Sequence, residues 1–269
     1  MRISCIKQRE EKSILKENKT MNYRTTKKLI TGITAATLLI AAGIPAAMAE
    51  EEAPSADASI GFYSKYIWRG FELSDDSMVI QPSLTASYKG FSANLWANLD
   101  TDLYGTDTHK WNETDFTLSY DGAYEKLGYG AGWIYYALDG TDDTQEFYGT
   151  LSYDVLLAPS FTIYYDTDSF AGAWYANLAF GHTFMIAEKY GLDLGASFGY
   201  LDDNDGYSEF HNGLLSASMS FPIHEYLAIT PEIYWSFPLS GEAGDYITAA
   251  SISNDDNFVY GGISASFSF

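Results

Sequence analysis

The side chains with the clearest catalytic potential gather around His211, which lies near Ser208, Asn212 and Ser216 in the sequence. A serine hydroxyl, a histidine base and an orienting polar group are the parts of a nucleophilic hydrolase. A sequence gives no geometry for these groups, and chance proximity is the expected finding in a chain with so many serines. We therefore expect no catalytic residue, no enzyme activity and no cofactor.

An acidic run at residues 202–206 has some of the residue types of a calcium loop. If Gly206 is aligned with the glycine of an EF-hand, Leu201 falls where the first carboxylate belongs and Asn212 where the bidentate glutamate belongs. The pattern fails, and no cysteine or paired-histidine spacing suits zinc. We expect no metal site, and we interpret the run as a solvated or lipopolysaccharide-facing loop.

Acidic side chains dominate the composition, with 36 Asp and Glu against 15 Lys and Arg and a net charge of −21. The first 49 residues hold nine of the basic and three of the acidic residues, so the other 220 carry six basic and 33 acidic residues, a net charge of −27. Nucleic acid is excluded as a partner, because its phosphates require Lys and Arg. A surface this acidic suits cations or a solvated outer surface.

A short apolar run at residues 29–42 follows Arg24, Lys27 and Lys28, and it leads to Ala47-Met48-Ala49. This order is typical of a secretory signal peptide. The run is too short for a membrane span of ~20 residues. The predicted organisation is a leader and signal peptide at 1–49, cleaved after Ala49 and with Met21 as an alternative start to Met1, a flexible acidic N-terminus at 50–56, and a folded unit at 57–269.

Apolar and small or polar residues alternate with period two through this folded unit, as in Leu192, Leu194, Ala196 and Phe198. Such alternation predicts strands with two different faces. We predict twelve strands, with ten or fourteen as the range, near residues 57–68, 78–88, 91–100, 112–121, 128–138, 145–155, 160–168, 172–182, 191–201, 208–221, 226–237 and 256–269.

The links between the predicted strands separate a soluble sandwich from a membrane barrel. Short links such as Lys89-Gly90 alternate with long acidic ones such as residues 239–255. Short periplasmic turns and longer outer loops are typical of transmembrane barrels. Closing the sheet pairs every backbone group in the lipid. The sequence therefore predicts an all-β fold, a closed antiparallel transmembrane β-barrel in the outer membrane, in contact with lipid and lipopolysaccharide.

Aromatic side chains make up 16% of the chain and gather near the predicted strand ends. Such residues form girdles at the two headgroup levels, and we assign to them Tyr66, Trp68, Tyr88, Tyr120, Trp133, Tyr135, Tyr153, Trp174, Tyr175, Tyr200 and Trp235. The chain ends on Phe269, with Phe267 on the same face. We interpret these two as a signal for the barrel assembly machinery, reached with the help of periplasmic chaperones.

The face opposite the apolar one lines the lumen of a barrel. By parity it carries the proposed pore-lining residues Lys65, Arg69, Asn94, Asn98, Asp115, Asp166 and Glu232, together with Asp121, Asp154 and Asp193. Carboxylates outnumber cations on this face, which favours cation preference if the lumen conducts. Lys65 and Arg69 would instead plug the interior if they neutralise neighbouring acids. In a separate alternative, Asp115, Asp166 or Glu232 holds Arg69 and leaves a transverse field across a narrow eyelet.

The first predicted strand and its loop match a known pattern, S-x-Y-x-x-R-G-x-x-x-S, through Ser64, Tyr66, Arg69, Gly70 and Ser74. Further matching elements are Leu95-Trp96-Ala97-Asn98, Glu113-x-Asp115, Tyr135-Tyr136 and Glu146-Phe147-Tyr148-Gly149. The chain thereby resembles the TorF family, also called the Gcw_chp outer-membrane family, over nearly all of residues 50–269. Gln81-Pro82 departs from the family's usual Gln-Gly. The resemblance implies a small porin of undefined substrate.

These observations favour a passive channel for small solutes. A substrate-specific channel is the first alternative, with an aromatic or sugar ring bound by luminal tyrosines: Tyr63, Tyr136, Tyr148, Tyr164 and Tyr234. A structural or adhesive barrel without conductance is the second. The oligomeric state stays open.

Overall fold

A computed structural model describes residues 53–102, 109–186 and 190–269 of the chain. The predicted leader and signal peptide at 1–49, the choice between Met1 and Met21, and residues 50–52 lie outside the described residues. Cleavage after Ala49 therefore stays a prediction. Among the described residues, no helix is long and apolar enough to cross a membrane.

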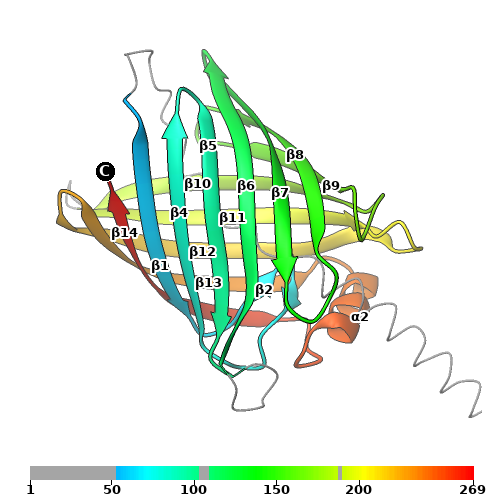
Figure 1. Ribbon diagram of the computed structural model, residues 1–269. Helices are drawn as coiled ribbons and strands as arrows, with labels where there is room; N and C mark the ends of the chain where they lie inside the picture. Colours follow the sequence, from blue (N-terminus) through cyan, green and yellow to red (C-terminus); the bar gives the residue numbers. More distant parts are fainter. Residues whose placement is uncertain (1–52, 103–108, 187–189) are drawn as a thin grey trace, which may run out of the picture.

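Twelve antiparallel strands close into one barrel, as the alternation predicted (Figure 1). The strands are β1 (Ser55–Tyr63), β4 (Val79–Tyr88), β5 (Phe91–Asp100), β6 (Lys110–Tyr124), β7 (Leu127–Leu138), β8 (Thr144–Tyr153), β9 (Ser160–Asp166), β10 (Trp174–Ile186), β11 (Tyr190–Asp202), β12 (Ser208–His224), β13 (Leu227–Pro238) and β14 (Phe258–Ser268). The barrel closes where β1 pairs with β14, with Ala58 opposite Phe267 and Phe62 opposite Ile263. Closure leaves no unpaired sheet edge to face lipid.

The outside of the barrel is apolar. Alternate residues such as Leu84, Leu95, Phe147 and Ile163 are exposed on this face. The predicted aromatic girdles are confirmed at both ends, by exposed rings that include Tyr88, Phe91, Tyr124 and Tyr153 at one end and Trp111, Tyr165, Phe210 and Trp235 at the other. Tyr66, Trp68 and Tyr175 were wrongly assigned to the girdles, because all three are buried inside the barrel.

The two ends of the barrel differ as the sequence predicted. Short turns such as Lys89-Gly90 and Glu125-Lys126 lie at the end where the C-terminus lies (Figure 1). Residues 64–78, 139–143, 167–173, 203–207 and 239–257 connect strands at the opposite end, and 154–159 is the longest turn at the C-terminal end in the described part of the chain. Because short turns face the periplasm in outer-membrane barrels, we refer to these as the inner and outer ends.

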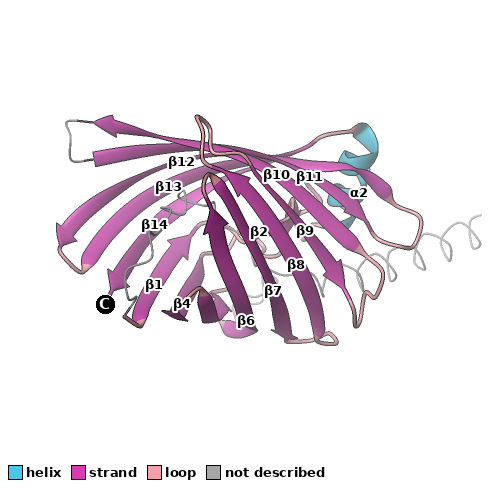
Figure 2. Cartoon of the chain, turned by 90° about the horizontal axis from the view of Figure 1, so that it is seen from above, coloured by secondary structure: helices cyan, strands magenta, loops and turns pink. Residues whose placement is uncertain are grey.

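The first strand is shorter than predicted. It ends at Tyr63 rather than at residue 68, and residues 64–78, the hairpin segment, turn into the barrel. This segment contains a two-stranded hairpin, β2 (Ile67–Trp68) and β3 (Phe71–Glu72). Figure 2 shows β2 between the front and back walls of the barrel. Alternation alone did not reveal this break, since Tyr66 and Trp68 continue the period of the strand.

A helix was also missed in the predicted loop at residues 239–255. Helix α2 (Gly241–Ala250) begins after Ser240, whose hydroxyl accepts a hydrogen bond of 3.0 Å from the Ala243 amide. Its buried residues are Ala243, Gly244, Ile247 and Ala250, and only Ile247 has a large apolar side chain. Glycine has a low helix propensity, so packing at the outer end stabilises this helix rather than its own sequence.

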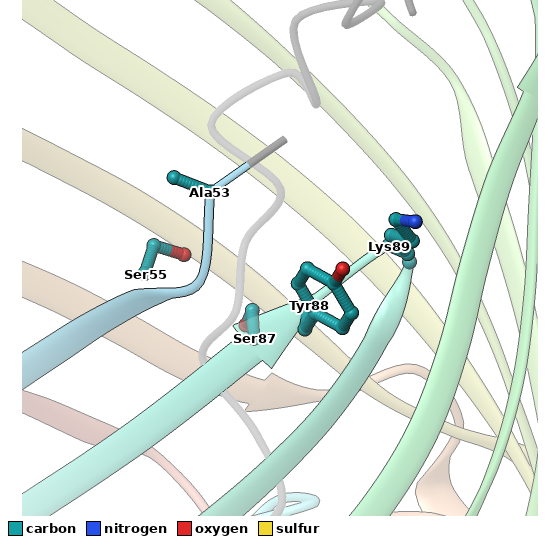
Figure 3. A pocket seen from close by; sticks show the side chains of 6 residues that line it. Ala53, Ser55, Ser87, Tyr88 and Lys89 are labelled. Atoms are coloured by element: carbon teal, nitrogen blue, oxygen red, sulfur yellow. The ribbon is translucent and has the colours of Figure 1, made fainter. Parts of the chain in front are cut away.

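A shallow depression of about 360 Å³ lies at the inner rim, lined by Ala53, Ser55, Ser87, Tyr88 and Lys89 (Figure 3). Its lining consists of short polar side chains, one ring and one ammonium, without a convergent set of polar groups. It is far in the fold from the hairpin segment. The polar groups that do converge lie inside the barrel.

Candidate functional site

The tip of the hairpin is formed by Arg69 and Gly70. Trp68 pairs with Phe71, and the two residues between them have φ values of 44° and 91°. A two-residue hairpin loop with positive φ at both positions is a type I′ turn, in which glycine is favoured. A Cβ at Gly70 would also lie 2.9 Å from Cβ of Asn212. The turn therefore requires glycine at 70 and presents the side chain of Arg69.

Arg69 forms a bidentate ion pair with Glu146 of β8. Its Nη1 and Nη2 donate to Oε1 and Oε2 over 2.8 and 2.7 Å, and both residues are buried. The Tyr136 hydroxyl donates a third bond of 2.8 Å to Oε2. Burial alone would lower the pKa of Arg69, but the Glu146 carboxylate more than offsets this and raises it. The guanidinium is thus permanently charged and held to the wall in the strongest hydrogen-bonding geometry for such a pair.

Three aromatic rings surround the same guanidinium. Its Cζ lies 4.2 Å from the ring centroid of Trp68, 4.5 Å from that of Tyr164 and 4.6 Å from that of Tyr175. Cations at this distance from an aromatic face are attracted by the ring quadrupole. Only Trp68 comes from the hairpin. We name the four wall residues, Tyr136, Glu146, Tyr164 and Tyr175 from β7 to β10, the cation cage.

The other side of the hairpin packs against β12 and α2. The Phe71 ring lies 4.8 Å from that of His211 and 6.0 Å from that of Tyr246. Tyr246 stacks on Tyr207 at 3.9 Å. The Glu72 amide donates to the Ser251 hydroxyl over 3.1 Å. The helix and the residue that follows it hold the hairpin inside the outer end.

Side chains fill the outer half of the lumen. Every strand from β4 to β14 contributes a buried lumen-facing residue at this level: Val79, Asn98, Asp115, Tyr136, Glu146, Asp166, Tyr175, Leu201, His211, Tyr234 and Tyr260. Tyr66, Trp68 and Phe71 of the hairpin segment are buried among them. The sequence left pore and plug open, and in this conformation the outer half is plugged.

The inner half of the lumen is different, because its lining is short, polar and partly accessible. Asn94 donates bonds of 2.8 Å to the hydroxyls of Ser83 and Thr85. Similar half-buried residues continue around the wall: Ser59, Thr117, Ser119, Thr150, Thr162, Ser197, Ser216, Ser218 and Ser264. Carboxylates are present at Asp121, Asp193 and Glu232, whereas the Lys and Arg residues in the described part of the chain lie at the turns, the outer rim or the hairpin segment.

The predicted pore-lining residues are divided between these two levels. Asp115 and Asp166 are buried in the outer half, and Asn98 is fully buried between Gln81 and Asn112. Asn94 and Glu232 line the inner half. Glu232 accepts bonds from Ser264 over 2.7 Å, from Tyr63 over 3.1 Å, and from Tyr234.

Lys65 and Arg69 are not on a strand, contrary to the parity assignment. Lys65 forms ion pairs with Glu72 and Asp76 of its own segment. Asp154 is likewise beyond the end of β8, in a turn. The parity rule failed for these residues because it applies only where the strand continues.

Glu146 is the residue of this candidate site that the sequence did not reveal. The sequence offered Asp115, Asp166 and Glu232 as partners of Arg69. Arg69 forms its ion pair with Glu146 and with none of these three. Asp166 instead accepts from Thr144 and from the amides of Asp168 and Phe170. Parity alone would have placed Glu146 on the luminal face, in step with Tyr148 and Thr150.

The geometry around His211 does not form a nucleophile and base. Its Nδ1 lies 2.7 Å from the Tyr207 hydroxyl, and the Ser208 hydroxyl donates to Asp202 instead. His211 is fully buried against Phe71. This histidine therefore helps to hold the hairpin, and the expectation of no enzyme activity stays a prediction.

Comparison with known proteins gives barrels of low similarity. No protein-family model matches the chain and no curated protein matches it, so the resemblance to the TorF family is not confirmed. Among solved structures, the KdgM porin is 9% identical with a TM-score of 0.49, covering 80% of this chain and 99% of that one. The NanC porin is 12% identical with a TM-score of 0.48, covering 79% and 98%. The COG4313 outer-membrane channel from Pseudomonas putida F1 is 8% identical with a TM-score of 0.48, covering 86% and 100%. Similarities of this size carry no argument about solute or mechanism.

The class of the protein follows from its own structure. An even number of antiparallel strands closes on itself, the outer face is apolar with aromatic rings near both ends, and the ends have short turns and long loops respectively. These properties define an integral β-barrel protein of the outer membrane.

Proposed function

We propose that this barrel is a channel for small solutes that prefers cations and is closed at rest by its hairpin segment. The observation that carries the proposal is the inner half of the lumen, which is polar and partly accessible. It ends at the hairpin segment, and among the described residues one buried ion pair joins this segment to the wall. A purely structural barrel has no need for a hydroxyl-lined interior. Water-filled interiors of this kind are typical of porins.

Cation preference follows from the charges that face the inner half. Asp121, Asp193 and Glu232 are carboxylates, and no described Lys or Arg opposes them there. Fixed charges between low-dielectric walls raise the local concentration of counter-ions. Rings of acidic side chains act in the same sense in cation channels.

Replacement of the hairpin segment tests the channel function. Tyr63 and Val79 are register partners on β1 and β4, so residues 64–78 can be replaced by Asn-Gly, which closes a two-residue hairpin. We expect frequent conductance steps in planar bilayers from the shortened protein and rare ones from the full chain. A shortened barrel that folds, judged by heat-modifiable gel mobility, yet never conducts would contradict the proposal.

The packed outer half favours one other candidate, a barrel that never opens and has a structural or adhesive role. The experiment above separates the two, because removal of the plug would not create conductance in a barrel whose inner half is also closed. Liposome swelling separates a general pore from a substrate-specific one. A general pore admits solutes according to size, whereas a specific one saturates.

A further inference from the structure

The cage around Arg69 belongs to the barrel wall, and the hairpin only supplies its occupant. Glu146, Tyr164 and Tyr175 lie on three adjacent strands, β8, β9 and β10. Resting on the proposed channel function, we propose that the cation cage is a binding site for solutes that carry a guanidinium group. Arg69 is its tethered occupant, and a free guanidinium competes with it and releases the hairpin.

The cage is held in place by contacts that do not involve the hairpin. The Tyr136 hydroxyl orients the Glu146 carboxylate. Tyr164 packs between Tyr148 at 5.5 Å and Tyr175 at 6.3 Å. The Tyr175 hydroxyl donates to Asn212 over 2.9 Å. The site therefore keeps its shape when the hairpin leaves, and a buried carboxylate without a cation is strongly disfavoured.

The geometry of the cage selects a planar, delocalised cation. Two parallel N–H groups match the two Glu146 oxygens, and the guanidinium carbon lies over the Tyr164 and Tyr175 rings. A guanidinium meets both requirements, whereas an ammonium ion is a strongly hydrated point charge without a fork of donors. Nε of Arg69 is buried and makes no hydrogen bond to any described residue. The wall thus recognises only the two terminal nitrogens, which any alkylguanidinium possesses.

Competition with a tethered side chain sets the concentration at which a free ligand acts. A short tether gives its group an effective concentration on the order of millimolar or above. The full chain therefore responds to guanidinium only at high concentration. A variant without the Arg69 side chain has a vacant cage and responds at lower concentration.

The test uses Arg69→Ala with Arg69→Ala/Glu146→Gln as its matched control, both checked for folding by heat-modifiable mobility. The probes are guanidinium, methylguanidinium, ammonium and sodium chloride at constant ionic strength. Calorimetry in detergent measures binding, and planar bilayers measure the change in conductance. We expect R69A to bind guanidinium at least ten-fold more tightly than ammonium, and at least ten-fold more tightly than the control does.

Equal binding by R69A and its control, or equal effects of guanidinium and ammonium, would overturn the proposal. If R69A does not fold, Arg69→Met keeps the packed stem of the side chain and takes its place. Glu146-dependent binding without conductance in any variant would leave the site in place and reject the channel function. Conductance in R69A without preference for guanidinium would support the channel function and reject the binding site.

Discussion

The ion pair between Arg69 and Glu146 is the most consequential contact at the scale of single residues. Glu146→Gln removes the charge but keeps the size of the side chain, so the buried guanidinium of Arg69 loses its counter-ion. Removal of one partner of a buried pair costs about 3–5 kcal/mol. We expect the plugged state to lose up to this much stability, and bilayer recordings should show a higher open probability.

Asp205→Asn is the control for this prediction, because Asp205 is exposed in an outer loop and loses a similar charge. Equal open probability in the two variants would mean that the ion pair does not hold the plug.

The proposed cation preference also depends on individual side chains. Glu232 lies midway along β13 and is partly accessible, so its charge acts on ions that pass through the proposed channel. Glu232→Gln should lower the cation preference measured as a reversal potential under a salt gradient, and the preference of the unaltered channel should weaken at high ionic strength. Neutralising Asp142 in an outer loop should matter less. Anion selectivity of the unaltered channel, or no response to the Glu232 change, would reject the assignment of the lumen.

At the scale of elements, the hairpin depends on its turn. Gly70→Ala places a Cβ at a φ of 91° and 2.9 Å from Asn212, whereas Gly140→Ala has a similar φ of 84° with nothing within 4 Å. Both changes strain the backbone by about 1–3 kcal/mol. Only the first adds a clash inside the barrel, so only G70A should raise the open probability. Similar recordings from both variants would show that the close packing of the turn is unimportant.

Strand β14 gives the prediction about assembly. The Phe269 amide donates to the Ala56 carbonyl over 2.8 Å, and the residue is 73% exposed. Phe269→Ser keeps the backbone bonds and removes the ring, whereas deletion of Phe269 removes both. We expect both changes to reduce insertion while export stays intact, with the deletion the more severe.

Fractionation and heat-modifiable mobility measure this effect. Phe210→Ser, which removes an exposed ring at the outer end, is the control. Normal levels of the Phe269 variants in the outer membrane would show that the terminal ring is no assembly signal.

At the scale of the whole molecule, a closed wall surrounds a short insert. Each wall strand pairs with two neighbours, so backbone hydrogen bonds hold the barrel whether or not the hairpin is present. The hairpin, by contrast, has only two paired residues in each strand and depends on side-chain contacts with the wall and α2. Opening therefore breaks side-chain contacts of the hairpin segment at the outer end and leaves the backbone pairing of the wall intact.

The sequence by itself determined the wall of this protein. Period-two alternation is a local property, and it specified twelve strands, their two faces and the luminal position of Asn94, Asp115 and Glu232. Only the tertiary structure decided how the outer half is filled. Arg69 and Glu146 are 77 residues apart, and parity assigns a side chain to a face without giving its height or its neighbour around the barrel. The hairpin and α2 are short elements that packing stabilises, so their local sequence carries too little signal to reveal them.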